Sequence, residues 1–163
     1  MWTYIRKRGP GVVRLLLIVA GLLFVAFLFE PTFRHKGYSE EDSAIITLRA
    51  LNTAEAVYAS TYNSGFTDTL SKLGAPASGR ATADGAGLVD PILAGNRWNG
   101  TATTFTDAEY AFYYARGPRL AGKIDSYTIT ANPLELGRSF FTDQTGIVRA
   151  NLVTAATASD SPI

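Results

Sequence analysis

The chain has 163 residues, 47% of them hydrophobic, and a formal net charge of +1. This length suffices for one membrane span and one small domain but not for two domains, and the near-balanced charge gives no electrostatic case for binding nucleic acid. The sequence contains no cysteine. Disulfides, thiol nucleophiles and cysteine-ligated metals are therefore excluded.

The N-terminal segment predicts a membrane anchor. An unbroken apolar run extends from Leu15 to Phe29. Together with Gly11 to Val13 it approaches the ~20 residues that cross a bilayer. A cleaved secretory signal is disfavoured because Phe29 to Phe33 offers no small residue at a cut site. A buried core helix is the other alternative, but a charge-free run of this length is rarely one.

Basic residues set the expected orientation of this span. Four precede it, and Arg34 and Lys36 follow it. The positive-inside rule then places the N-terminus in the cytoplasm and the remainder of the chain outside. We expect residues 1–37 to form a cytoplasmic basic leader, a transmembrane anchor and a juxtamembrane hinge, and residues 38–163 to form one globular domain.

The stretch from Ser39 to Tyr62 predicts an amphipathic helix that organises this domain. Ser39 can cap its start, and the first turn is acidic, which suits the positive end of the helix dipole. At 3.6 residues per turn, one broad face is expected to contain Thr47, Ala50, Leu51, Ala54, Val57, Tyr58, Thr61 and Tyr62. The opposite face is expected to contain Asp42, Arg49, Asn52, Thr53 and Ser60. The small side chains of Ala50 and Ala54 favour close packing against a sheet.

The segment after this helix is mostly irregular by composition. Thr67 to Gly74 predicts a short helix that Thr67 caps, and Ala75 to Gly87 predicts a loop. Leu88 to Ala94 predicts a further helical turn.

The C-terminal half changes to a period of two, which indicates strands. The expected strands are Glu109 to Ala115, Ser126 to Ala131, Ser139 to Thr142 and Ile147 to Asn151. Asp143 to Gly146 predicts a hairpin turn, with Asp143 capping it. Short links between the strands predict a four-stranded antiparallel meander that covers the helix. We expect the tail from Thr154 to be frayed.

No catalytic constellation emerges from the residues. Gly117 to Lys123 matches most of a phosphate-binding loop, but Ile124 stands where Ser or Thr would hold magnesium, and no helix is expected to follow. We interpret it as a hairpin loop. His35 has no partner nearby in sequence. We therefore expect no enzyme activity, no cofactor, no metal and no small-molecule substrate.

Several segments of the globular half resemble type IV pilin-like proteins of the pilus and type II secretion (pseudopilin) class. The segments that carry the resemblance are LRALNTAEAVYASTY (48–62), the GF and LSKLG pieces of 65–74, AGLVDPILAG (86–95), YTITANPLELGRSFFTDQTGIVR (127–149) and ATASDSPI (156–163). The resemblance covers most of residues 48–163. It implies an α+β fold in which a long N-terminal helix packs by its outer half on an antiparallel sheet.

The N-terminus is similar to a degenerate pilin leader. Arg6 to Gly9 resembles the basic leader that ends in glycine before a cut, and Pro31 falls where such a helix has its bending proline. The residue after the candidate cut is Pro10, where the family carries Phe or Met. Arg14 stands where the family has the glutamate that is thought to neutralise a neighbouring subunit's N-terminal amine. An arginine there would place like charges together in a low dielectric.

The resemblance implies a non-enzymatic protein of the bacterial inner membrane with a periplasmic or extracellular pilin-like domain. Its expected partners are the lipid bilayer and subunits of a pilus or secretion system. One alternative is a working filament subunit cut after Gly9. An alternative of another class is an anchored extracytoplasmic binding domain.

Overall fold

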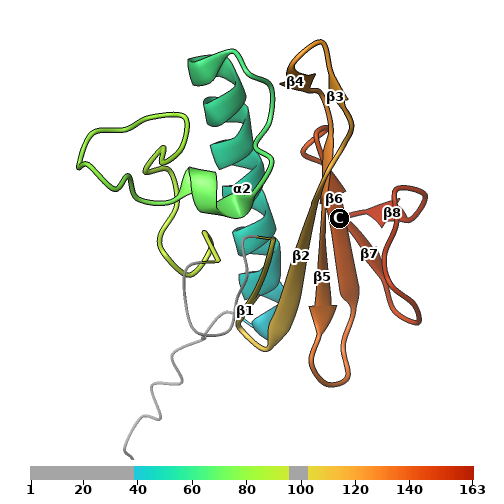
Figure 1. Cartoon of the computed structure of the whole chain (residues 1–163). Helices are drawn as coiled ribbons and strands as arrows, with labels where there is room; N and C mark the ends of the chain where they lie inside the picture. The colour runs from blue at the N-terminus through green and yellow to red at the C-terminus, as the bar shows by residue number, and fades with distance from the viewer. Residues whose placement is uncertain (1–38, 96–102) are drawn as a thin grey trace, which may run out of the picture. The chain divides into compact units, whose positions relative to one another are not determined.

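The computed structural model describes residues 39–95 and 103–163 (Figure 1). The chain divides into two units, Met1–Gly37 and Tyr38–Ile163, and the fold below is that of the second. In the described residues it is α+β, as expected. The elements in chain order are α2 (Glu40–Tyr62), the 3-10 helix η1 (Leu70–Leu73), and strands β1 (Thr104–Asp107), β2 (Tyr110–Arg116), β3 (Arg119–Leu120), β4 (Lys123–Ile124), β5 (Tyr127–Pro133), β6 (Ser139–Asp143), β7 (Arg149–Asn151) and β8 (Ser161–Pro162).

Helix α2 begins and ends where local chemistry predicts. The Ser39 hydroxyl accepts a hydrogen bond from the Asp42 amide at 3.1 Å, and the Asp42 carboxylate accepts one from the Ser39 amide at 3.3 Å. This reciprocal pair is a capping box in which aspartate takes the usual place of glutamate. At the other end Asn63 has a left-handed backbone, with φ 51°. The helix ends there because Asn tolerates this conformation better than most residues.

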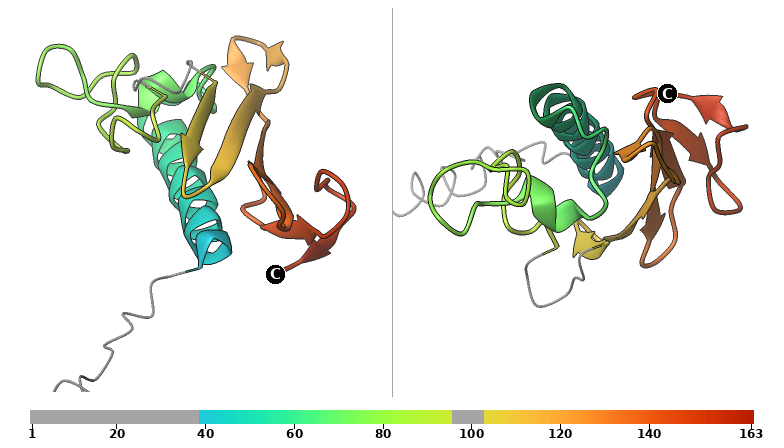
Figure 2. Two further views of the ribbon diagram at one scale, coloured as in Figure 1. Left: turned by 90° about the horizontal axis from the view of Figure 1, so that it is seen from below. Right: turned by 45° about the horizontal axis from the view of Figure 1, so that its top comes forward.

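The buried face of α2 differs from the predicted one. Ala50 and Val57 are exposed, whereas Leu48, Asn52 and Glu55 are buried. The difference arises because two layers cover the helix. The sheet lies on one side, and η1 with the loops that follow it, residues 70–95, lies alongside the helix on the side away from β7 and β8 (Figures 1 and 2). The buried residues of α2 are Ala44, Thr47, Leu48, Leu51, Asn52, Ala54, Glu55 and Tyr58.

Among the described residues the main sheet has six strands in the order β1-β2-β5-β6-β7-β8, all antiparallel, rather than the predicted four. It is a meander interrupted by the separate hairpin β3–β4. Strand β1 escaped prediction because its turn to β2 contains no glycine. Ala108 and Glu109 adopt positive φ there, at 47° and 60°. Such hairpin turns are usually recognised by Asn-Gly or Asp-Gly.

The alternation in β2 and β5 is confirmed. Tyr110, Phe112 and Tyr114 are buried on β2, and Tyr127 and Ile129 are buried on β5. They belong to one hydrophobic core with Leu48 and Leu51 of α2 and with Leu70 and Leu73 of η1. The predicted turn is also confirmed, since the Asp143 carboxylate accepts a hydrogen bond from the Thr145 amide at 2.9 Å.

The tail after Thr154 is ordered, so the prediction of a frayed end was wrong. The Ser139 hydroxyl donates to the Thr154 carbonyl at 2.5 Å, and β8 pairs with β7. Ala156 is buried. Phe140 belongs to the core and Thr142 bonds to Asn52 of α2, so Ser139 and Phe141 lie on the outer face of β6. The tail binds this face at Ser139. Composition misled the prediction because Ala, Ser and Thr carry little hydrophobic signal even where they pack.

The short helix after α2 is smaller than predicted. It is a single 3-10 turn, Leu70–Leu73, and Thr67 is not its cap. Residues 91–95 form turns without becoming a helix, and the Ala94 amide donates to the Asp90 carbonyl at 3.1 Å.

Candidate functional site

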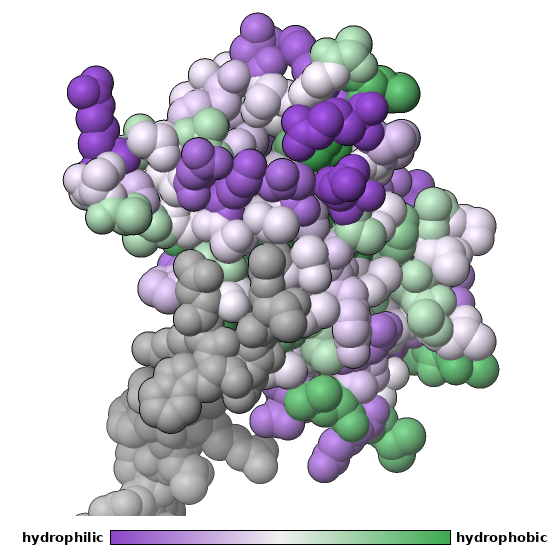
Figure 3. Space-filling model, in the orientation of Figure 1, coloured by the Kyte–Doolittle hydropathy of each residue, from purple (hydrophilic) through white to green (hydrophobic). Residues whose placement is uncertain are grey.

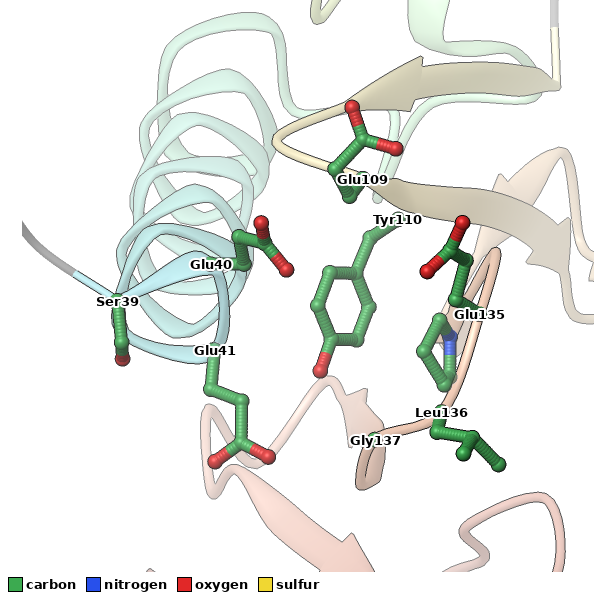
Figure 4. Close-up of a pocket in the computed structure, with 9 residues that line it drawn as sticks. Ser39, Glu40, Glu41, Glu109, Tyr110, Glu135, Leu136 and Gly137 are labelled. Atoms are coloured by element: carbon green, nitrogen blue, oxygen red, sulfur yellow. The ribbon is translucent and has the colours of Figure 1, made fainter.

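A hollow of about 730 Å³ opens at the start of α2 (Figure 4). Three parts of the chain that are distant in sequence surround it: the first turn of α2, the β1–β2 turn and the β5–β6 loop. Its lining consists of Ser39, Glu40, Glu41, Glu109, Tyr110, Pro133, Glu135, Leu136 and Gly137. Four of these nine residues are glutamates, so the hollow is strongly acidic.

Local structure places each glutamate. The capping box at Ser39 fixes the first turn of α2, and with it Glu40 and Glu41. Glu109 stands in the tight β1–β2 turn, and Glu135 stands in the β5–β6 loop. The antiparallel pairing of β2 with β5 brings these two connections together, because Tyr110 at the start of β2 is opposite Pro133 at the end of β5.

One arginine, Arg138, forms an ion pair with a glutamate of this acidic hollow. The Arg138 Nη2 and Nε atoms donate to the Glu41 Oε2 atom at 2.6 and 2.9 Å, and the Arg138 amide donates to Oε1 at 3.3 Å. The hydrogen bond from the Arg138 side chain lowers the pKa of Glu41. Burial, and then the charge of Glu41, raise the pKa of Tyr110, whose hydroxyl donates to the Arg138 carbonyl at 2.9 Å.

These groups give the hollow the chemistry of a negatively charged surface. Arg138 balances Glu41, and no ion pair is found for Glu40, Glu109 or Glu135 among residues 39–95 and 103–163. Within the same residues, no group of three His, Cys, Asp or Glu side chains is arranged to hold a metal ion. The Tyr110 hydroxyl already donates to a carbonyl.

A second polar cluster lies in the interior, further along the same helix. Glu55 is fully buried and accepts hydrogen bonds from the Thr67 amide at 2.9 Å and the Thr67 hydroxyl at 2.5 Å. The Tyr114 hydroxyl lies 3.2 Å from the Thr67 hydroxyl and donates to the Thr67 carbonyl at 2.6 Å. Burial raises the pKa of Glu55, because removal from water disfavours the charged carboxylate, and the nearby Asp68 charge adds to the shift.

A neighbouring buried chain of hydrogen bonds ties α2 to the sheet. The Tyr127 hydroxyl donates to the Asn52 Oδ1 atom at 2.9 Å, and the Asn52 Nδ2 atom donates to the Thr142 hydroxyl at 2.8 Å. Burial, followed by the charge of Glu55, raises the pKa values of Tyr114 and Tyr127. Both clusters satisfy buried polar atoms, so their role is to fix the helix, the loop after it and the sheet in one arrangement.

The sequence prediction missed Glu55 and Asn52. A glutamate in a helix is ordinarily assigned to the solvent face. The available signal was spacing: Glu55 lies four residues after Leu51 and three before Tyr58, both of which are buried. Thr67 was assigned to a helix cap, whereas its hydroxyl binds Glu55.

The segment that matches most of a phosphate-binding loop, Gly117 to Lys123, forms a hairpin, as interpreted from the sequence. Strand β3 pairs with strand β4, which ends at Ile124. The Lys123 side chain donates a hydrogen bond to the Asn63 side chain at 2.8 Å. The amide of Phe66 donates to the Ile124 carbonyl at 2.8 Å. The hairpin therefore holds the end of α2.

The site residues predicted at the N-terminus lie outside the described residues. They are Gly9, Pro10, Arg14, the span Leu15 to Phe29, and Pro31. Among the residues that the structure does describe, no helix combines the length and the apolar character needed to cross a membrane. No protein-family model, no curated protein and no solved structure matches this chain.

Proposed function

We propose that this chain is a non-enzymatic, single-pass protein of the bacterial inner membrane. Its pilin-like globular domain is held on the periplasmic or extracellular side, and its N-terminus lies in the cytoplasm. It serves as a structural or accessory component of a type IV pilus or a type II secretion-like system.

The observation that supports this proposal best is the order of segments along the chain. The apolar run Leu15 to Phe29 is followed closely by α2, and α2 packs on an antiparallel meander. This order matches what the resemblance to pilins implies for a helix whose outer half covers a sheet.

The N-terminal residues favour a subunit that stays in the membrane. Pro10 is a poor residue after a scissile bond, and as a secondary amine it is an unusual target for the N-methylation that pilins receive. Arg14 replaces the glutamate used in assembly, and a like-charge pair in the apolar core of a filament costs several kcal/mol.

The intact mass of the protein, extracted from its native membrane, tests the proposal. A mass that starts at Met1 or Trp2 supports a membrane-retained component. A mass that starts at Pro10, with or without a methyl group, shows processing after Gly9 and makes the filament-subunit alternative the better one.

The charge argument has its own test. We expect Arg14→Glu to increase entry of the protein into sheared extracellular filaments, because it restores the family's assembly charge. Arg14→Gln serves as the control, since it removes the positive charge without supplying a negative one. Equal filament entry for the wild type and both variants would contradict the electrostatic argument.

A further inference from the structure

We propose that the end of the globular domain where α2 begins docks on the surface of the bilayer through aliphatic side chains of two loops. The loops are the β5–β6 loop, with Leu134 and Leu136, and the segment after β7, with Leu152 and Val153. We call these four residues the aliphatic tips. The inference rests on the membrane anchor of the proposed function.

The aliphatic tips are unusually exposed for large apolar side chains. Leu134 is 54% exposed, Leu136 104%, Leu152 76% and Val153 90%. Hydrophobic surface is visible at the lower end and lower right of the molecule in Figure 3. Single exposed leucines are ordinary, but grouped ones mark an interaction site.

Strand register places the aliphatic tips at one end of the sheet. Leu134 directly follows the end of β5, and Leu136 shortly precedes β6. Leu152 directly follows Asn151 of β7, which is opposite Ser139 at the start of β6. Pro133 and Gly137 of the first loop and Leu152 and Val153 of the second line a common hollow of about 290 Å³. The two loops are therefore neighbours.

The described domain begins at this same end, with Ser39, and the apolar run precedes Ser39 in the chain. Ser39 and Leu136 line one hollow, and the Glu41–Arg138 ion pair joins the first turn of α2 to the β5–β6 loop. Phe29 stands ten positions before Ser39. An extended chain of that length spans at most about 35 Å. If the bilayer holds Phe29, Ser39 lies within about 35 Å of the bilayer. This short connection favours lipid, rather than another protein, as the partner that covers the aliphatic tips.

The charges beside the aliphatic tips specify the lipid. Glu135 stands between Leu134 and Leu136, and Glu40 and Glu109 line the adjoining hollow. Aliphatic side chains enter the boundary between headgroups and acyl chains, whereas carboxylates are repelled by anionic headgroups. The tips should therefore prefer a surface of neutral, zwitterionic headgroups to one rich in anionic lipid.

Single-cysteine labelling of the full chain tests the inference, and the absence of native cysteine makes the labelling specific. Leu136→Cys and Val153→Cys would carry an environment-sensitive fluorophore in phosphatidylcholine vesicles that contain a nitroxide-labelled lipid. Leu120→Cys is the matched control. Leu120 is also an exposed leucine, at 60%, but its hairpin is bonded to the end of α2 through Lys123 and Asn63.

We expect nitroxide lipid to quench the fluorophore at positions 136 and 153 about twofold more than at position 120, with a blue-shifted emission. Replacing part of the phosphatidylcholine by phosphatidylglycerol should reduce this difference. Equal quenching at all three positions would overturn the inference. A blue shift without lipid quenching that disappears when the protein is diluted in lipid would also overturn it, because a second copy would then cover the tips.

Alkaline carbonate extraction of the same vesicles separates this inference from the proposed anchor. Protein that resists extraction but shows no quenching at positions 136 and 153 retains the anchor and refutes the docking. Protein that carbonate removes refutes the anchor, and the docking that rests on it.

Discussion

Two glutamates of α2, Glu41 and Glu55, hold distant segments of the chain by opposite means. Glu41, at the start of the helix, binds the guanidinium of Arg138 in partial contact with solvent. Glu55, fourteen positions later, is fully buried and binds the amide and hydroxyl of Thr67, with no ion pair among residues 39–95 and 103–163. The pKa of Glu41 is lowered by its partner, whereas burial raises the pKa of Glu55.

The difference teaches where the domain is firmly held. An exposed ion pair loses most of its Coulomb energy to water and salt. A buried carboxylate contributes little by itself, but removing it leaves its partners without hydrogen bonds in the interior. Substitutions at the start of α2 should therefore reduce the free energy of unfolding only slightly. Substitutions in the interior contacts around Glu55 should reduce it strongly.

The largest effect is expected from Glu55→Ala. This change leaves the Thr67 amide and hydroxyl without their acceptor and opens a cavity, so we expect a loss of about 3–5 kcal/mol in the free energy of unfolding. Urea unfolding of the full chain in mild detergent, followed by circular dichroism, measures it. Glu55→Gln is the control, because its amide oxygen can still accept one hydrogen bond. A loss under about 1 kcal/mol for Glu55→Ala would contradict a structural role.

A smaller loss is expected from Gly65→Ala, just after the end of α2. Gly65 has φ 76°, and an added Cβ would lie 2.2 Å from the Ile124 carbonyl oxygen. Strain and overlap together should cost about 2–3 kcal/mol in the same unfolding measurement. Gly122→Ala is the matched control, because Gly122 has φ 84° but open space around it. If both variants lose the same stability, the contact with Ile124 is not what requires glycine.

Tyr114→Phe should lose about 1–2 kcal/mol, because its hydroxyl donates to the Thr67 carbonyl in the interior. The adjacent Tyr113 is half exposed on the other face of β2, so Tyr113→Phe should leave stability unchanged. Comparing the two variants by thermal unfolding isolates the buried hydroxyl. Equal midpoints for both would show that the bond to Thr67 contributes nothing.

The two glutamates should also produce opposite dependences of stability on pH. A raised pKa means that the folded state holds the proton of Glu55 more tightly, so its contribution declines as the pH rises from 4.5, its ordinary pKa, through its raised folded value. The lowered pKa of Glu41 gives a contribution that is present above pH 4.5 and declines as the pH falls below it. Unfolding curves from about pH 3 to 8 measure both trends, because this range extends to either side of the ordinary carboxyl pKa values near 4.

Two variants assign these trends. Glu55→Gln should flatten the decline above pH 4.5, and Glu41→Gln should flatten the decline below it. If Glu55→Gln leaves the slope above pH 4.5 unchanged, another group titrates there, and burial of Glu55 does not govern it.

The smallest effect is expected from Arg138→Ala at the start of the helix. The Arg138 and Glu41 side chains are about one-third exposed, so the loss should be about 0.5–1 kcal/mol and should diminish in high salt. Unfolding at low and high salt measures it, with Arg116→Ala as the control, since Arg116 binds the Gly117 carbonyl rather than a carboxylate. A loss that is large and insensitive to salt would place the firm contacts of the domain at this end instead.

Much of the fold follows from local sequence. The cap at Ser39, the left-handed end at Asn63, the alternation in β2 and β5, and the turn at Asp143 each depend on residues close together in the chain. Strand β1 and the ordered tail could not be predicted from local sequence. The pairing of β1 uses a turn with no glycine, and the tail is held by a hydrogen bond from Ser139 to Thr154.

The sequence by itself determined that one capped amphipathic helix precedes a meander of antiparallel strands, because hydrogen bonding and periodicity act over a few residues. The sequence also predicts a membrane anchor upstream of this helix, because an apolar run can be recognised without knowledge of the fold. Only the tertiary structure decided that Glu55 is buried, since two layers rather than one cover α2. The tertiary structure alone also brought Glu109 and Glu135 close to Glu41. Strand register determines which turns lie side by side, and long-range packing sets that register.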